Sequence, residues 1–148
     1  MIKLNSSVGK PYVDEYKPRM RSFFTPTYLY AADGTEKPLK CNTGYHIQIS
    51  SPSDGDYFII PVFCSGSETI LELSHYKGTD NGIVDLYVNG VLDSSAYDQY
   101  ASSSTPSHTS ITLTRPIVAG WNEIKFVVNG KNASSSSYYL GIYGVRLR

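Results

Sequence analysis

The chain has 148 residues, 41% of them hydrophobic and 18% charged, which is enough to bury the core of one domain and excludes a disordered protein. Its 13 Lys and Arg balance 13 Asp and Glu, so the concentrated basic surface of a nucleic-acid-binding protein is not expected. No apolar run reaches about 18 residues, which excludes a membrane-spanning helix. Tyrosine is abundant, with 13 copies against 5 Phe and 1 Trp, as is typical of half-exposed β surfaces and contact patches.

Residues 1–44 are predicted to form an extended N-terminal arm. They contain four of the eight prolines, no sustained helical period and a single strand-like run, TYLYAA. Residues 1–40 carry seven Lys or Arg against four Asp or Glu, whereas residues 41–148 carry six against nine. We therefore expect the basic arm to pack on the acidic body of its own chain or of a neighbour. The start lacks the apolar middle of a secretory signal, so either the mature form begins here or the protein stays in a cytoplasm.

Residues 45–148 are predicted to form a β-sandwich domain. Short segments rich in β-branched and aromatic residues follow one another, separated by Gly, Asn, Asp and Ser. These segments are YHIQIS, DYFIIPVFC, TILELSHY, GIVDLYVNGVL, SITLTR, NEIKFVVNG and YYLGIYGVRL. No stretch longer than about ten residues has a helical pattern.

Several of these segments alternate between apolar and polar residues. In NEIKFVV, Ile124, Phe126 and Val128 share one face of the strand, and Glu123 and Lys125 share the other. One buried and one solvated face on each strand predicts antiparallel sheets packed on each other. The predicted fold class is therefore all-β, an antiparallel β-sandwich with an extended N-terminal arm.

Two local features of the pattern are specific enough to predict. Asn89 and Gly90 both tolerate a positive φ, so they predict a tight hairpin between DLYV and VL. In the last segment the apolar alternation slips by one residue at Gly144, which predicts a β-bulge there.

The sequence contains no catalytic signature, since GxSxG, Walker, HExxH and paired-cysteine zinc patterns are all missing. His46, His75 and His108 are isolated from one another, so no catalytic residue, metal site or cofactor is predicted. Glycoside hydrolysis needs only two carboxylates across a cleft, but a small sandwich leaves little depth for one. Cys41 and Cys64 either form a disulfide or are two small buried thiols, and the second interpretation is the simpler.

The stretch TILELSHYKGTDNGIVDLYVNGV, together with ITLTRPIVAGWNEIKFVVNGKNASSSSYYLGIYGVRL, resembles the jelly-roll sandwiches of the family-6 and family-35 carbohydrate-binding modules. It is also similar to related β-sandwich domains in the virion proteins of tailed phages. The resemblance covers about residues 56–148 and depends on the strand before GTDNGIVDLYVNGV, the Gly-anchored AGWNEIKFVV, the loop GKNASSSSYY and the closing LGIYGVRL. It implies a jelly roll.

The resemblance also implies a carbohydrate site. In those modules the ligand lies on loops at one edge of the sandwich, where aromatic rings stack on sugars and an asparagine of the last loop bonds to sugar hydroxyls. Asn132 in GKNASSSS matches that asparagine. The candidate carbohydrate-binding residues are Tyr97, Tyr100, Trp121, Asn132 and Tyr138.

Other interpretations of these residues stay open. Trp121 follows Gly120 and enters an inward-pointing strand, which favours an anchor at the edge of the core over an exposed platform. The serines at 134–137 either contact a sugar or form a flexible connection. The resembled families often bind structural calcium with acids near the first and last strands, but LGIYGVRL contains no acid, so calcium is not carried over.

The predicted function is that of a non-enzymatic structural protein of a tailed-phage particle, either a capsid decoration or a tail component, that binds host-surface glycan. The initial Met without an export signal and the arm, which suits ordering on a neighbouring subunit, favour this prediction. Expected partners are other virion proteins, a glycan and further copies of the chain in a symmetric oligomer such as a trimer. The expected location is the virion, after synthesis in the host cytoplasm. The alternative is an extracellular carbohydrate-binding module of a glycoside-active enzyme, and a small lyase is a weaker third possibility.

Overall fold

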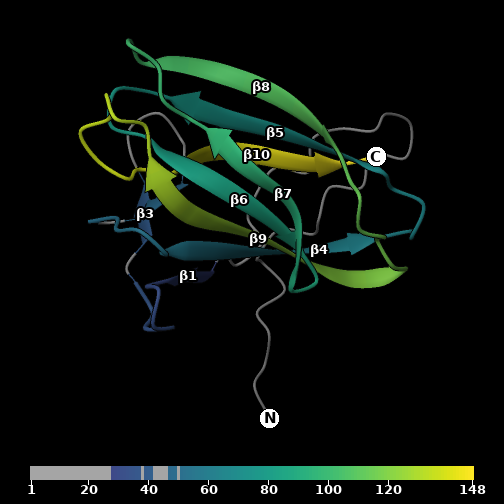
Figure 1. The fold of residues 1–148 in the computed structure, drawn as a ribbon. Coiled ribbons are helices and arrows are strands. Elements are labelled where there is room, and N and C mark those ends of the chain that lie inside the picture. The colour runs from purple at the N-terminus through teal and green to yellow at the C-terminus, as the bar shows by residue number, and fades with distance from the viewer. Residues whose placement is uncertain (1–27, 38, 42–46, 50) are drawn as a thin grey trace, which may run out of the picture.

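The computed structural model describes residues 28–37, 39–41, 47–49 and 51–148, and these form two antiparallel sheets that face each other (Figure 1). None of the described residues lies in a helix, so this part of the chain offers no helical segment that could cross a membrane. The predicted all-β antiparallel sandwich is confirmed.

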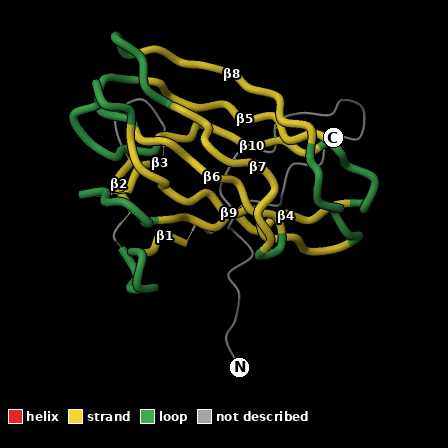
Figure 2. The backbone as a smooth tube through the Cα atoms, viewed as in Figure 1, coloured by secondary structure: helices red, strands yellow, loops and turns green. Residues whose placement is uncertain are grey.

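Each sheet has five strands, in the order β1-β4-β9-β6-β7 in sheet A and β2-β3-β10-β5-β8 in sheet B. The traced backbone shows the loops gathered at the two ends of this sandwich (Figure 2). The strands are β1 (Tyr28–Tyr30), β2 (Leu39–Cys41), β3 (Ile47–Ile49), β4 (Tyr57–Cys64), β5 (Ile70–Lys77), β6 (Gly82–Val88), β7 (Val91–Asp98), β8 (Thr105–Thr112), β9 (Gly120–Lys131) and β10 (Gly141–Leu147).

The core lies between the sheets and follows the alternation in the sequence. On β9, Ile124, Phe126 and Val128 are buried, while Glu123 and Lys125 lie on the outer face of sheet A. Phe126 packs against Phe58 of β4 with ring centroids 5.5 Å apart. Burying each such large side chain stabilises the fold by about 1.5–3 kcal/mol. The buried apolar residues are Phe58, Ile60, Cys64, Leu71, Leu73, Val84, Leu86, Val88, Ile117, Ile124, Phe126, Val128, Leu140, Ile142 and Val145.

Both local predictions are confirmed. Asn89 and Gly90 connect β6 to β7 with φ angles of 50° and 79°, the left-handed values that a tight hairpin turn requires. On β10, the register with β5 shifts between Ile142 and Gly144. The slip in alternation therefore marks a real β-bulge.

The sandwich extends further toward the N-terminus than residue 45. Strands β1 and β2 fall within the segment assigned to the arm, yet β1 pairs with β4 and β2 pairs with β3. Strand β1 lies within the strand-like run TYLYAA, whereas the three residues of β2 carry too little periodicity to be recognised in a sequence. Residues 1–27 lie outside the described part of the chain, so the arm itself stays a prediction, as does the state of Cys41.

Candidate functional site

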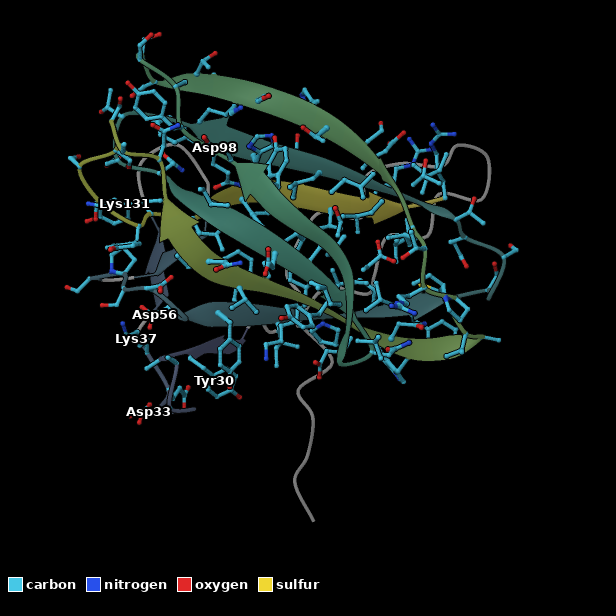
Figure 3. All side chains as sticks on the ribbon, viewed as in Figure 1. Tyr30, Asp33, Lys37, Asp56, Asp98 and Lys131 are labelled. Atoms are coloured by element: carbon cyan, nitrogen blue, oxygen red, sulfur yellow. The ribbon has the colours of Figure 1, made fainter. Side chains whose placement is uncertain are left out.

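The loop end of the sandwich holds most of the sequence-predicted candidates. We use this name for the loops that follow β5, β7 and β9, and Figure 3 shows Asp98 and Lys131 together at this end. Here the Asn132 Nδ2 donates a hydrogen bond of 2.8 Å to the Asp98 Oδ2. The Asn132 Oδ1 accepts a bond of 2.9 Å from the backbone N–H of Ser134. Each polar atom of the predicted sugar-binding asparagine thus makes one bond that holds the loop and keeps the capacity for one more.

The serine run after Asn132 is a fixed connection. The Ser135 hydroxyl, only 5% exposed, lies 2.8 Å from the Asn81 carbonyl oxygen and 2.9 Å from that of Ser137. The Ser136 N–H donates to the Thr79 carbonyl at 2.9 Å. These bonds join the β9–β10 loop to the β5–β6 loop. The run therefore fastens two loops together.

Tyr100 and Tyr138 also lie at the loop end, and both are half-buried. The Tyr100 N–H donates to the Asp98 Oδ1 at 2.8 Å, which fixes the start of the β7–β8 loop. Tyr138 packs against the core, and the Lys131 Nζ lies 4.9 Å from the centre of its ring. The structure thus brings Tyr100, Asn132 and Tyr138 to one end of the fold, held by bonds within the protein.

Tyr97 points between the sheets. Its hydroxyl lies 2.5 Å from the His75 Nε2 and 2.7 Å from the Thr109 Oγ1, so it bridges sheet A to sheet B. Burial raises the pKa of Tyr97 above its ordinary value. Burial lowers the pKa of His75 from 6.5 to about 4, with the positive charge of Lys77 acting in the same direction. His75 and Tyr97 therefore form a neutral polar bridge inside the sandwich.

Trp121 lies at the beginning of β9, ten residues and about 30 Å from Lys131 at its other end. Its side chain is 66% exposed on the outer face of sheet A. The ring makes an edge-to-face contact with Phe63 of β4, with centroids 5.5 Å apart. The interpretation of Trp121 as an anchor of the core is therefore wrong. Gly120 is at a φ of 104°, a conformation that lets the chain enter β9 with residue 121 on the outer face and Asn122 on the inner one.

A shallow groove of about 460 Å³ opens beside Trp121 on this outer face. Its lining combines aromatic, apolar and polar side chains, which is the composition of small-molecule sites. The labelled Tyr30 in Figure 3 marks the groove's other aromatic wall, beneath β4 and β9. The lining residues are Tyr30, Ile59, Pro61, Asn89, Trp121, Asn122 and Glu123.

Asn122 holds the edge of this groove in place. It is 3% exposed, and its Oδ1 accepts bonds of 3.0 Å from the Val118 N–H and from the Asn89 Nδ2. Its Nδ2 donates to the carbonyl oxygens of Val118 and Gly120 at 2.8 and 3.1 Å. A single buried amide thus joins the loop before β9 to the β6–β7 hairpin. The backbone next to Trp121 is consequently held in place, while most of the Trp121 side chain stays exposed.

Within the described residues, no group of three or more His, Cys, Asp or Glu side chains could hold a metal ion. A calcium site built from acidic side chains does not fit this part of the chain. Asp56, for example, is buried and paired with the Lys37 ammonium, and Asp98 is used by Tyr100 and Asn132.

Sequence reasoning missed the groove's apolar floor and its acid. Ile59 and Pro61 lie on the outer face because inward positions of β4 are taken by Phe58 and Ile60. A signal was present, since YFIIPVF is apolar in both phases of the strand and so predicts apolar side chains on the outer face as well. Glu123 carried no signal, because an acid facing outward is the ordinary case for a strand.

No protein-family model matches the sequence, and no curated protein is significantly similar to it. Several solved structures share the fold. A Paenibacillus xanthan lyase matches with a TM-score of 0.58 and 20% identity over 80% of this chain, which corresponds to 13% of the lyase chain.

Two isolated modules match over nearly their whole length. A family-36 carbohydrate-binding module in complex with calcium and xylotriose has a TM-score of 0.50 and 15% identity, covering 83% of this chain and 99% of that one. A family-35 module from Clostridium thermocellum has the same TM-score and identity, covering 82% and 97%. At these identities the shared property is the fold: this chain has the β-sandwich fold of carbohydrate-binding modules.

Proposed function

We propose that this protein is a non-catalytic glycan-binding β-sandwich and that it binds sugar in the groove on the outer face of sheet A. The observation that carries the proposal is Trp121, an indole ring 66% exposed at the edge of a groove. Phe63, which contacts this ring, is itself 54% exposed, so two touching aromatic rings face the solvent. Such an exposed aromatic surface is typical of a binding site.

The groove offers what sugar recognition needs. The indole face stacks on the C–H face of a pyranose ring, and Ile59 and Pro61 form an apolar floor beneath it. The carboxylate of Glu123, which has no partner among the described residues, supplies a polar group for the hydroxyls. The groove is shallow and open, which suits a sugar chain lying along the surface better than an enclosed small molecule. The fold shared with a module whose structure contains xylotriose supports the same ligand class.

The test is titration of a glycan panel with the protein and its Trp121→Ala variant. Removing the ring is expected to weaken binding about 10- to 100-fold, as for a central aromatic contact. Leu92→Ala is the control, because Leu92 is exposed and apolar but does not line the groove. Both variants should keep their thermal stability, since neither side chain is buried. Equal binding by the protein and Trp121→Ala would refute the site.

Two settings are proposed for this function. The tailed-phage structural role predicted from the sequence depends on an arm that lies outside the described residues. The alternative, a module of a glycoside-active enzyme, is supported by the match to 13% of a xanthan lyase chain, since such sandwiches occur there within a larger protein. Light scattering separates the two, because a virion subunit is expected to form a stable oligomer and a module a monomer.

A further inference from the structure

The groove carries an asymmetric charge. Among its lining residues Glu123 is the charged one, and no described residue forms an ion pair or hydrogen bond with its carboxylate. The carboxylate shares the outer face with the ring of Trp121, because both residues occupy odd positions of β9. A glycan stacked on Trp121 therefore has a carboxylate beside its edge.

The nearest candidate to neutralise Glu123 is occupied elsewhere. Lys125 lies two residues further along the same face, and its Nζ sits 4.0 Å from the ring centre of Tyr57 and 5.6 Å from that of Tyr87. The ammonium is thus held over tyrosine rings, and no ion pair joins it to Glu123 among the described contacts. The carboxylate is left as a hydrogen-bond acceptor that lines the groove and has no partner among the described residues.

Two consequences follow for the ligand. A carboxylate has two oxygens that can accept from a pair of neighbouring hydroxyls, and such charge-assisted bonds are about twice as strong as neutral ones. The same charge repels a carboxylate on the sugar, because like charges brought together at a partly desolvated contact oppose binding. The Glu123 side chain thus both binds the hydroxyls of a neutral sugar and repels a uronate.

We infer that the groove selects neutral glycans whose pyranose units present two neighbouring hydroxyls to Glu123, and that it excludes uronate-containing glycans. This inference rests on the proposed function. It concerns the chemistry of the ligand and not the existence of the site. Glu123 would be the residue that determines specificity, with Trp121 supplying the stacking surface.

The experiment compares neutral β-linked trisaccharides of glucose, xylose and galactose with counterparts that contain one glucuronate, by calorimetric titration. The protein is expected to bind at least one neutral trisaccharide and to bind its uronate counterpart at least ten-fold more weakly. Glu123→Gln should lose about ten-fold in affinity for the neutral sugar and should no longer discriminate between the two. Asp80→Asn is the matched control, because it removes one carboxylate at the loop end.

The outcomes separate the two proposals. If no trisaccharide binds the protein, or if Trp121→Ala binds as well as the protein does, the proposed function fails. If glycan binds through Trp121 but Glu123→Gln keeps both affinity and discrimination, the function stands and the inference about Glu123 is overturned. Preferred binding of the uronate sugar, or loss of discrimination in Asp80→Asn, would also overturn it.

Discussion

The loop end and the outer face of sheet A differ in whether their side chains bond within the protein or are exposed to solvent. At the loop end, both polar atoms of Asn132 are bonded within the protein, and Ser135 is buried. On the outer face, Trp121 is held in place from below by Asn122 while its own ring stays exposed. Residue types that suit a ligand are present in both regions, but a side chain can bind a ligand only with groups that the fold leaves unused. Because the indole ring of Trp121 is unused whereas Asn132 has only part of its capacity left, the face is the site that we propose for the glycan.

The largest expected effect tests how the face depends on Asn122. Asn122→Ala removes four hydrogen bonds from a side chain that is 3% exposed and leaves its partners without a bond. We expect the free energy of unfolding to fall by about 3 kcal/mol. Glycan affinity should fall too, because the loop before Trp121 loses its anchor. Urea unfolding and glycan titration measure the two effects.

A second substitution at this position distinguishes the donor of the amide from its acceptor. Asn122→Asp keeps the acceptor that serves the Val118 N–H but places a carboxylate oxygen against the carbonyl oxygens of Val118 and Gly120. It should lose at least as much stability and glycan affinity as Asn122→Ala, because the donor is what holds the loop. An Asn122→Ala protein with normal affinity for glycan would show that Trp121 needs no such support.

The second effect is a dependence of the free energy of unfolding on pH. It comes from the buried His75 and should not change glycan binding on the outer face. Because burial lowers the pKa of His75 to about 4 in the folded protein, the unfolded chain binds the proton more readily. The contribution of neutral His75 to the free energy of unfolding is fully present above about pH 6.5 and is lost progressively as the pH falls toward 4. At pH 5 the loss is about 2 kcal/mol relative to pH 7.

Urea unfolding at several pH values measures this loss, with His75→Gln as the comparison. In that variant the slope of stability between pH 4 and 6.5 should flatten, whatever its absolute stability. An unchanged slope would assign the pH dependence to other groups. The result also concerns Tyr97, whose hydroxyl bonds to His75. A steep slope of stability against pH in the unchanged protein supports a structural role for Tyr97 between the sheets.

The third effect tests whether Asn132 at the loop end has a structural role or binds the glycan. Asn132→Ala should lower the free energy of unfolding by about 1 kcal/mol, since its two side-chain bonds lie at the surface. Glycan affinity should stay within two-fold of the unchanged protein. Strong loss of affinity without loss of stability would instead move the sugar site to the loop end, as the family resemblance implies.

Much of the fold could be predicted from the sequence, because alternation is a property of the chain itself. The buried positions of β9, the Asn89-Gly90 hairpin and the bulge at Gly144 all follow from local pattern. Strand β1 lies within the strand-like run TYLYAA, but its pairing with the distant β4 could not be predicted. Strand β2 could not be predicted at all, since its three residues hold no period.

The site was less predictable than the fold. Trp121 was recognised as a candidate, but its exposure depends on which face of β9 it occupies and on the turn at Gly120. The internal bonds of Asn132 depend on Asp98, 34 residues away in the chain. Neither the exposure of Trp121 nor the bond between Asn132 and Asp98 can be predicted from the spacing of residues in the sequence. A family pattern indicates which residue types gather at an edge, while only the folded chain shows which of their atoms are already used.

The smallest expected effect compares matched lysines in the two regions. Lys125 on the outer face lies over the rings of Tyr57 and Tyr87, whereas Lys131 at the loop end lies over Tyr138 alone. Replacing either by Met keeps an apolar stem and removes the charge. Since a cation over an aromatic ring contributes about 0.5–1 kcal/mol at a surface, Lys125→Met should lose about 0.5 kcal/mol and Lys131→Met less. Neither should change affinity for a neutral glycan by more than two-fold, because neither lysine lines the groove. If Lys125→Met weakened the binding of uronate sugars further, the ammonium would contribute to the charge of the face, which would then have to be assigned to Glu123 and Lys125 together.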